Sequence, residues 1–383
     1  MQSCWAVIPR ATFRLGLIAV LLLAAAATTA NGADANYLQL AQRGAAQAQR
    51  TWRDHRDKRR HGDRRWYDER LHDHDTYPLA TIWGAVPLFE TLDLIELAHP
   101  SRKNRRAVDA FAHGAERYWD RRLTPGGGYA PYPGDRAPDV QTWMDDNGWW
   151  GLGFLDAWRA THESRYLADA ERGFNYAYAA GWDPAAGGLW WNTHHPYKSG
   201  VAMGANALLS SLLYTATHDP SYLSTAEQLI GWATQNLWNA HDQLYAKDSF
   251  DQTSQPYVEG GFAESHEVIC QATGDSFYCN QARTLADRSY ARFFNRYSEL
   301  NQGPQYDVIY LRVMLEYGKA TRETRWRALA SHEAERALVN ARTANNVYLR
   351  AWDGSDMSRH QAAPGMLRTD AATVELFAAL AGA

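Results

Sequence analysis

The sequence predicts an all-α protein, an (α/α)6 toroid in which six inner and six outer helices form a single domain. Three observations support this fold class. A short polar turn recurs along the chain at intervals of 48 to 56 residues. An apolar helical pattern precedes each turn, and a more charged, amphipathic pattern follows it. Helical patterns at the two chain ends supply a sixth pair that would close the ring. An open α-solenoid is the alternative, which this pairing of the ends disfavours.

The repeated turn combines an Ala-Thr pair with an acidic residue and then an aromatic one. Its threonines are Thr161, Thr217, Thr273 and Thr321, with spacings of 56, 56 and 48 residues. A more degenerate copy begins at Ala98. Each copy would connect an inner helix to the outer helix that follows it.

The inner helices are apolar on more than one face, as expected of helices buried on most sides. We expect them at Thr81–Leu97, Asp146–Ala160, Met203–Ala216, Gly260–Gln271, Val308–Lys319 and Asp370–Ala381. The outer helices are expected at Asp34–Asp54, Arg105–Arg121, Ser164–Ala180, Ser221–Leu237, Ser276–Asn295 and Thr324–Arg342. Strands are hardly needed beyond short pieces in long loops.

The connections from each outer helix to the next inner helix are long. They are Lys58–Leu79, Leu123–Met144, Gly181–Gly200, Asn239–Glu259, Arg296–Asp307 and Thr343–Thr369. All six fall on one face of the toroid, at the N-terminal ends of the inner helices. Because long loops on a rigid scaffold usually carry the function, we expect the substrate cleft at this face.

Two adjacent carboxylates, Asp145 and Asp146, lie between Trp143 and Trp149 at the start of the second inner helix. A carboxylate pair is the minimum equipment for glycosidic hydrolysis, and helix N-termini favour anions. Neighbouring helical residues can place two carboxyl groups about 5 Å apart, as a retaining glycosidase requires. One aspartate would be the nucleophile and the other the acid/base. The alternative is that one of them is only a helix N-cap with a first-turn acid beside it.

The same loops offer aromatic and polar side chains for a sugar. Aromatic residues make up 13% of the chain, including 16 tryptophans. The aromatic candidates for sugar stacking, for which core packing is the alternative, are Trp143, Trp149, Trp150, Trp190, Trp191, Tyr197 and Tyr257. Lys198, Asp248 and Glu259 are candidate partners of sugar hydroxyls. Glu259, at the start of a later inner helix, is expected at a position equivalent to the aspartate pair.

The first 30 residues read as a secretory signal peptide, which leaves residues 31–383 as the catalytic domain. Arg10 and Arg14 precede an apolar run, Leu15–Ala27, that is too short to span a bilayer comfortably, and small residues follow it. No other segment is long and apolar enough to cross a membrane. We therefore expect a secreted or periplasmic protein without a membrane partner after cleavage.

Charge and cysteine usage narrow the possible partners. Removing the two leader arginines changes the formal charge from −4 to about −6, which argues against a nucleic-acid partner. Cys270 and Cys279 flank a turn and could form a disulfide, or remain two free thiols.

No metal or other cofactor is expected. Two runs contain residue types that can bind a metal ion, namely His72-Asp73-His74-Asp75 and His194-His195, but neither run has the spacing of a known metal site.

Two segments resemble glycoside hydrolase family 76, the endo-α-1,6-mannanases. The run Trp143-Met144-Asp145-Asp146-Asn147-Gly148-Trp149-Trp150 is similar to the family's catalytic Asp-Asp motif, and Gly187-Gly188-Leu189-Trp190-Trp191-Asn192 is similar to its Gly-rich Trp-Trp-Asn segment. The resemblance implies Asp145 as nucleophile, Asp146 as acid/base and an α-1,6-mannan substrate.

The same family resemblance extends to residues that would bind the substrate. It adds Lys198 and Asn206, the latter in an Asn-Ala-Leu helix start, although the spacing here is longer. The family's Tyr-Asn-Gln-Gly segment is Tyr257-Val258-Glu259-Gly260 in this chain, a departure that bears on substrate specificity.

The leading hypothesis is thus a monomeric, exported retaining glycoside hydrolase acting on a polysaccharide or oligosaccharide. A transglycosidase using the same pair is a close variant. A sugar epimerase or isomerase on the same toroid would need histidine bases, for which His266 is the one inner-helix candidate. A non-catalytic carbohydrate-binding protein is the third class.

Overall fold

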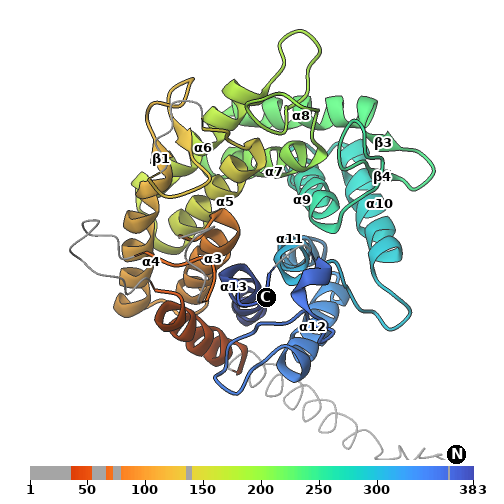
Figure 1. Ribbon diagram of the computed structural model, residues 1–383. Helices are drawn as coiled ribbons and strands as arrows, with labels where there is room; N and C mark the ends of the chain where they lie inside the picture. The colour runs from red at the N-terminus through yellow and green to blue at the C-terminus, as the bar shows by residue number, and fades with distance from the viewer. Residues whose placement is uncertain (1–35, 54–65, 72–78, 135–139, 361–362) are drawn as a thin grey trace, which may run out of the picture.

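Twelve helices form two concentric rings in the computed structural model, which describes residues 36–53, 66–71, 79–134, 140–360 and 363–383 (Figure 1). The inner ring consists of α3 (Ile82–Ala98), α5 (Met144–Thr161), α7 (Gly200–Thr217), α9 (Pro256–Thr273), α11 (Pro304–Thr321) and α13 (Leu367–Ala381). The outer ring consists of a helix at 36–51 and of α4 (Arg102–Ala115), α6 (Ser164–Gly181), α8 (Pro220–Asn236), α10 (Ser276–Phe293) and α12 (Arg325–Asn340). The predicted (α/α)6 toroid is confirmed.

The two chain ends close the ring, as predicted. The rings of Tyr37, in the helix at 36–51, and of Phe377, in α13, stack with centroids 6.4 Å apart. Gly44 lies against Val374, where a β-carbon would meet the valine methyl groups. On its other side α13 packs on α3, where Gly84 faces Leu367. The first and last described helices are therefore neighbours.

The repeated Ala-Thr turn has a local physical cause. The hydroxyls of Thr161, Thr217, Thr273 and Thr321 each donate to the carbonyl four residues earlier, at 2.7 to 2.9 Å. The next residue in each copy adopts the left-handed conformation, with φ from 59° to 72°. A left-handed residue after the last helical one is the common way to end a helix and to bond its free carbonyls. The repeat is thus a helix stop signal.

The predicted helices differ from the observed ones mainly at their ends. The inner helices α5, α7, α9, α11 and α13 begin two to four residues earlier than expected, and two of them, α9 and α11, begin with a proline. Proline is in fact favoured at the first helical position, since it lacks only an N–H that would have no partner there.

The largest correction in an outer helix concerns α4. It ends at Ala115 instead of Arg121, and the chain continues through a 3₁₀ turn, η1 (Glu116–Tyr118), into the short strand β1 (Trp119–Asp120).

Strands within the described ranges are confined to two short antiparallel pairs and isolated bridges in the long loops. In one pair β1 faces β2 (Gly128–Tyr129), with Trp119 opposite Tyr129. In the other, β3 (Trp238–Asn239) faces β4 (Leu244–Tyr245), with Trp238 opposite Tyr245. Both pairs precede an inner helix, so they help to position its N-terminal end.

A buried ion cluster lies on the inner ring, beyond the first turns of the helices. Arg312 of α11 contacts Asp156 of α5 at 2.8 Å, Glu90 of α3 at 2.9 Å and Glu375 of α13 at 3.1 Å. One guanidinium therefore joins four of the six inner helices by charge, in addition to their apolar packing.

Candidate active site

The predicted carboxylate pair occupies the first turn of α5. Asp145 and Asp146 are the second and third residues of the helix, and the N-cap residue is Trp143. The pair thus lies within the first turn of the helix, where the free N–H groups and the helix dipole favour negative charge.

Asp145 is buried but is surrounded by groups that favour its charged form. Its side chain is 4% exposed, and burial raises its pKa to about 7. The backbone N–H groups of Asp145 and Asp146 and the side chain of Trp191 lower that pKa, although less than burial raises it. Among the described residues, Oδ1 of Asp145 is buried and has no hydrogen-bond partner.

Asp146 has a different electrostatic environment. Burial raises its pKa well above the ordinary value, and the charge of Asp145 raises it further. The positive charge of Arg368 lowers the pKa of Asp146 but ranks behind both of these effects. Asp145 is therefore the first of the two to ionise, and Asp146 is the one that retains a proton.

Arg368 is held in place by a buried acid. It is the second residue of α13, and its Nη2 and Nε donate to Oε1 of Glu69 at 2.9 and 3.1 Å. The other oxygen of Glu69 accepts the backbone N–H of Thr81, the N-cap of α3, at 2.7 Å. Sequence reasoning missed both Arg368 and Glu69. The available signal was the register of the repeat, in which Arg368 occupies the position of Asp145.

Aromatic rings from three further inner helices meet beside the pair. Trp149 of α5 lies 6.4 Å from Tyr257 of α9, and Tyr257 stacks on Tyr306 of α11 at 5.2 Å. Trp83 of α3 contacts both tyrosines, at 6.4 and 5.6 Å. Burial raises the pKa of Tyr257, and the charges of Asp145 and Asp146 contribute, so this cluster borders the carboxylates. Trp149 and Tyr257 were predicted; Trp83 and Tyr306 were not.

A second set of rings combines Trp143, the N-cap of α5, with Trp191 and Tyr197 of the loop between α6 and α7. Trp143 lies 6.1 Å from Trp191, and Trp191 stacks on Tyr197 at 5.2 Å. The backbone fixes this arrangement, because Met144 donates to the carbonyl of Trp191 at 3.0 Å and Trp191 donates to that of Tyr197 at 3.0 Å. All three rings are half-buried and could be contacted by a ligand.

The structure places Lys198 and Trp190 together in the same loop. Lys198 is buried and donates to Asp183 at 2.8 Å and to the carbonyl of Gly188 at 3.1 Å. Its ammonium also covers the ring of Trp190. These contacts occupy Lys198 within the protein, so it supports the loop instead of reaching a sugar hydroxyl.

Glu259 and Asn206 are also structural in this fold, and the expected equivalence of Glu259 with the aspartate pair is wrong. Glu259 is fully buried and accepts the N–H of Tyr245 at 3.0 Å. It is the fourth residue of α9, equivalent to Asn147 of α5, which accepts the N–H of Tyr129 at 2.8 Å. Asn206, also fully buried, donates to the carbonyl of Met144 at 3.0 Å and so supports the start of α5.

One rule relates these positions around the ring. The fourth residue of α7, α9, α11 and α13, like that of α5, accepts a backbone N–H from the loop before the helix. The second and third residues instead supply the mouth of the ring, namely Trp83, Asp145, Asp146, Tyr257, Tyr306 and Arg368. A shift of one position therefore separates a loop anchor from a site residue.

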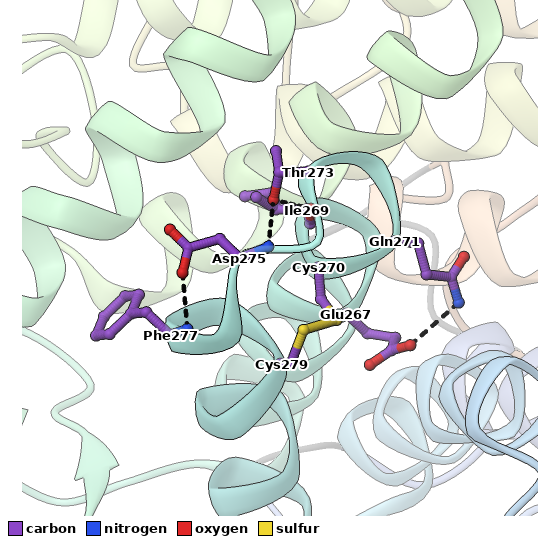
Figure 2. Close-up of a disulfide and its surroundings, with 8 residues drawn as sticks. All are labelled: Glu267, Ile269, Cys270, Gln271, Thr273, Asp275, Phe277 and Cys279. Atoms are coloured by element: carbon purple, nitrogen blue, oxygen red, sulfur yellow. Dashed lines mark hydrogen bonds between the residues drawn. A yellow bond between two sulfur atoms is a disulfide. The ribbon is translucent and has the colours of Figure 1, made fainter.

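Cys270 and Cys279 form a disulfide that joins α9 to α10 (Figure 2). Their Cα atoms are 4.9 Å apart across the repeated turn. In that turn Thr273 accepts the N–H of Asp275 at 3.1 Å, and Asp275 accepts the N–H of Phe277 at 2.8 Å. This turn is at the C-terminal end of α9, so the disulfide lies away from the carboxylate pair.

Some predictions fall outside the described residues. The signal peptide at 1–30 and the run from His72 to Asp75 are among them. Across the part of the chain that the structure describes, no group of three or more His, Cys, Asp or Glu side chains is placed to hold a metal ion. No helix there combines the length and apolar character needed to cross a bilayer.

Comparison with known proteins identifies this toroid as a glycoside hydrolase. The model of glycosyl hydrolase family 76 matches residues 126–327, more than half of the chain. The chain belongs to this family. A search of curated protein sequences found no match.

Solved structures of the same family share the fold. A family 76 α-mannanase of Bacteroides thetaiotaomicron has a TM-score of 0.78 at 20% identity, covering 90% of this chain and 95% of that one. A family 76 mannosidase from the same species has a TM-score of 0.79 at 20% identity, covering 91% and 98%. An α-1,6-mannanase of Salegentibacter, solved with α-1,6-mannotriose, has a TM-score of 0.70 at 16% identity, covering 90% and 99%.

Proposed function

We propose that this glycoside hydrolase cleaves α-1,6-mannan or related α-mannosides with retention of configuration. Asp145 is the nucleophile and Asp146 the acid/base. The observation that carries the assignment is the electrostatic difference between two adjacent buried carboxylates. Burial raises the pKa of both, but nearby N–H groups lower that of Asp145, whereas the like charge of Asp145 raises that of Asp146 further.

The chemistry follows from this difference. Asp146 gives its proton to the glycosidic oxygen while Asp145 attacks the anomeric carbon, so that the leaving sugar departs and a glycosyl-enzyme ester forms. Asp146, now ionised, takes a proton from water as the water attacks the same carbon and releases Asp145. Two inversions at one carbon give net retention. The aromatic rings beside the pair offer apolar faces to the sugars.

A structural neighbour supports the substrate and the catalytic pair. The Salegentibacter α-1,6-mannanase was solved with α-1,6-mannotriose as an inactive variant in which two consecutive aspartates are replaced by asparagine. Replacing an adjacent aspartate pair therefore gives an inactive variant of a protein of this fold, and we extend a catalytic role to Asp145 and Asp146.

The protein acts outside the cytoplasm as a single-domain enzyme in this proposal. Residues 1–30 are the export signal, and residues 31–383 are the mature catalytic domain. The disulfide between Cys270 and Cys279 supports the assignment, because disulfides persist mainly in oxidising compartments.

An epimerase or isomerase is not favoured by the histidine that suggested it. His266 is fully buried, its Nδ1 bonds to the carbonyl of Phe262 at 2.8 Å, and burial lowers its pKa to about 4. Such a histidine has no access to a sugar.

The test is hydrolysis of linear α-1,6-mannooligosaccharides by the wild type and by Asp145→Asn and Asp146→Asn. We expect cleavage by the wild type, strong loss in both variants, and an initial product with the α configuration by NMR. Full activity in both variants would exclude the catalytic pair, and an initial β product would exclude retention. Products longer than the substrate would identify transglycosylation by the same glycosyl-enzyme.

A further inference from the structure

An exposed phenylalanine lies in the loop between β4 and α9. Phe250 is 79% exposed, although phenylalanine normally packs into the core. A single exposed apolar residue needs no explanation by itself. The surroundings of Phe250, however, connect it to the candidate active site.

The loop that carries Phe250 is held by many bonds. Oδ1 of Asp248, a buried carboxylate, accepts the N–H of Phe250 at 2.8 Å and that of Asp251 at 2.7 Å. Ser249 donates its N–H to the carbonyl of Lys198 at 3.0 Å, and Ser199 forms a β-bridge with Asp248. The loop is thus attached to the start of α7, and the Phe250 ring is held outward on a fixed backbone. Asp248, a predicted sugar partner, has this supporting role.

Ring contacts lead from Phe250 to the nucleophile. Phe250 meets Tyr197 edge to face, with centroids 6.4 Å apart, and Tyr197 stacks on Trp191 at 5.2 Å. The carbonyl of Trp191 accepts the N–H of Met144, the residue before Asp145, at 3.0 Å. The side chain of Trp191 also lowers the pKa of Asp145, and the charge of Asp145 contributes to the raised pKa of Tyr197 after burial and Asp248. Three rings therefore form a continuous line from the carboxylate out to an exposed aromatic face.

We propose that Phe250 forms a distal sugar subsite, so that Trp191, Tyr197 and Phe250 bind successive parts of one polysaccharide chain. The inference rests on the proposed function, because the occupant is the substrate chain that leaves the cleft. Hexoses suit this line, since the C–H face of a sugar is apolar and packs on an aromatic ring while its hydroxyls stay in water. Binding removes the exposed ring of Phe250 from water, a gain that short substrates do not reach.

The test compares chain-length dependence in Phe250→Ala and the wild type. kcat/KM is measured on α-1,6-mannooligosaccharides from three to eight units and on the polymer. We expect Phe250→Ala to lower kcat/KM about tenfold more on the polymer than on the trisaccharide, by raising KM. A factor of about ten corresponds to the free energy of burying part of one aromatic ring. Phe250→Trp should restore the polymer preference. Phe277→Ala is the matched control, because Phe277 is 47% exposed and starts α10 at the opposite end of the toroid.

The outcomes separate this inference from the proposed function. Equal loss on all chain lengths, or no loss on the polymer, overturns the subsite. Absence of wild-type hydrolysis overturns the proposed function instead, and polymer affinity is then measured by calorimetry with and without Phe250→Ala. Unchanged or absent binding to the polymer in that experiment would also refute the role of Phe250.

Discussion

The ammonium of Lys198 lies over the face of the Trp190 indole, with Nζ 3.6 Å from the ring centroid. The carboxylate of Asp183 and the carbonyl of Gly188 complete its surroundings. All of these residues belong to the loop between α6 and α7 or to its end. One buried cation thus fixes the loop that places Trp191 beside Asp145.

We expect Lys198→Met to lower both the melting temperature and the activity. Loss of the ammonium leaves Oδ2 of Asp183 without its donor and frees Trp190, so the neighbouring Trp191 loses its fixed position. Small displacements of positioning groups can reduce rates strongly, and we expect kcat/KM to fall at least about tenfold. Thermal unfolding and steady-state kinetics measure both effects. Lys319→Met, which removes an exposed pair with Glu316, is the control. Lost activity with an unchanged melting temperature would place the Lys198 ammonium on the sugar.

Azide should separate the roles of the two aspartates. In Asp146→Ala the glycosyl-enzyme still forms from an aryl α-mannoside with a good leaving group, because no acid is needed there. Added azide then needs no base and should release the α-mannosyl azide. In Asp145→Ala azide replaces the nucleophile itself and should give the β-mannosyl azide. Product configuration by NMR decides the assignment, and the reverse pattern would exchange the two roles.

Arg368 should set the alkaline limb of the pH–rate profile. Asp145 must be ionised, so kcat/KM should rise as pH approaches about 7, the raised pKa of Asp145. Asp146 must be protonated, so activity should fall above its own, higher pKa. Arg368 lowers the pKa of Asp146, and Arg368→Gln should therefore move the alkaline limb to higher pH. Arg368→Lys keeps the charge and should restore the limb. A profile unmoved in Arg368→Gln would exclude this electrostatic role.

Asp145→Asn should stabilise the protein above neutral pH. The pKa of Asp145 is about 7 in the folded protein and 3.8 for an unperturbed aspartate, as in the unfolded chain, so the folded state binds more protons between these pH values. Stability therefore falls as pH rises through this range, and asparagine removes the fall. We expect a gain on the order of 2–4 kcal/mol at pH 8 and almost none at pH 4. Denaturant unfolding at both pH values checks this expectation. An equal gain at both would assign the effect to packing instead of ionisation.

Much of the architecture follows from local sequence. Thr161 and its three repeats end helices by bonding to their own backbone, so the repeat is visible without any tertiary contact. The apolar helices are buried on all sides and the amphipathic helices on one side, so their alternation along the chain predicts the inner and outer rings. Helix starts were less predictable, because Pro256 and Pro304 are compatible with both a loop and a first helical turn.

Local sequence patterns were sufficient to predict the ring of helix pairs, the loop-rich face and the position of Asp145 and Asp146 at that face. Three-dimensional packing was needed to tell which nearby polar residues line the mouth of the ring and which anchor a loop. Glu259 and Asn206 are buried and bond to backbone groups. Arg368, from the last helix, instead lowers the pKa of Asp146 by its positive charge. The physical reason is distance along the chain. Local hydrogen bonds and periodicity are encoded within a few residues, but the neighbours that bury a side chain or shift its pKa can come from distant parts of the chain, as Arg368 of α13 does for Asp146 of α5.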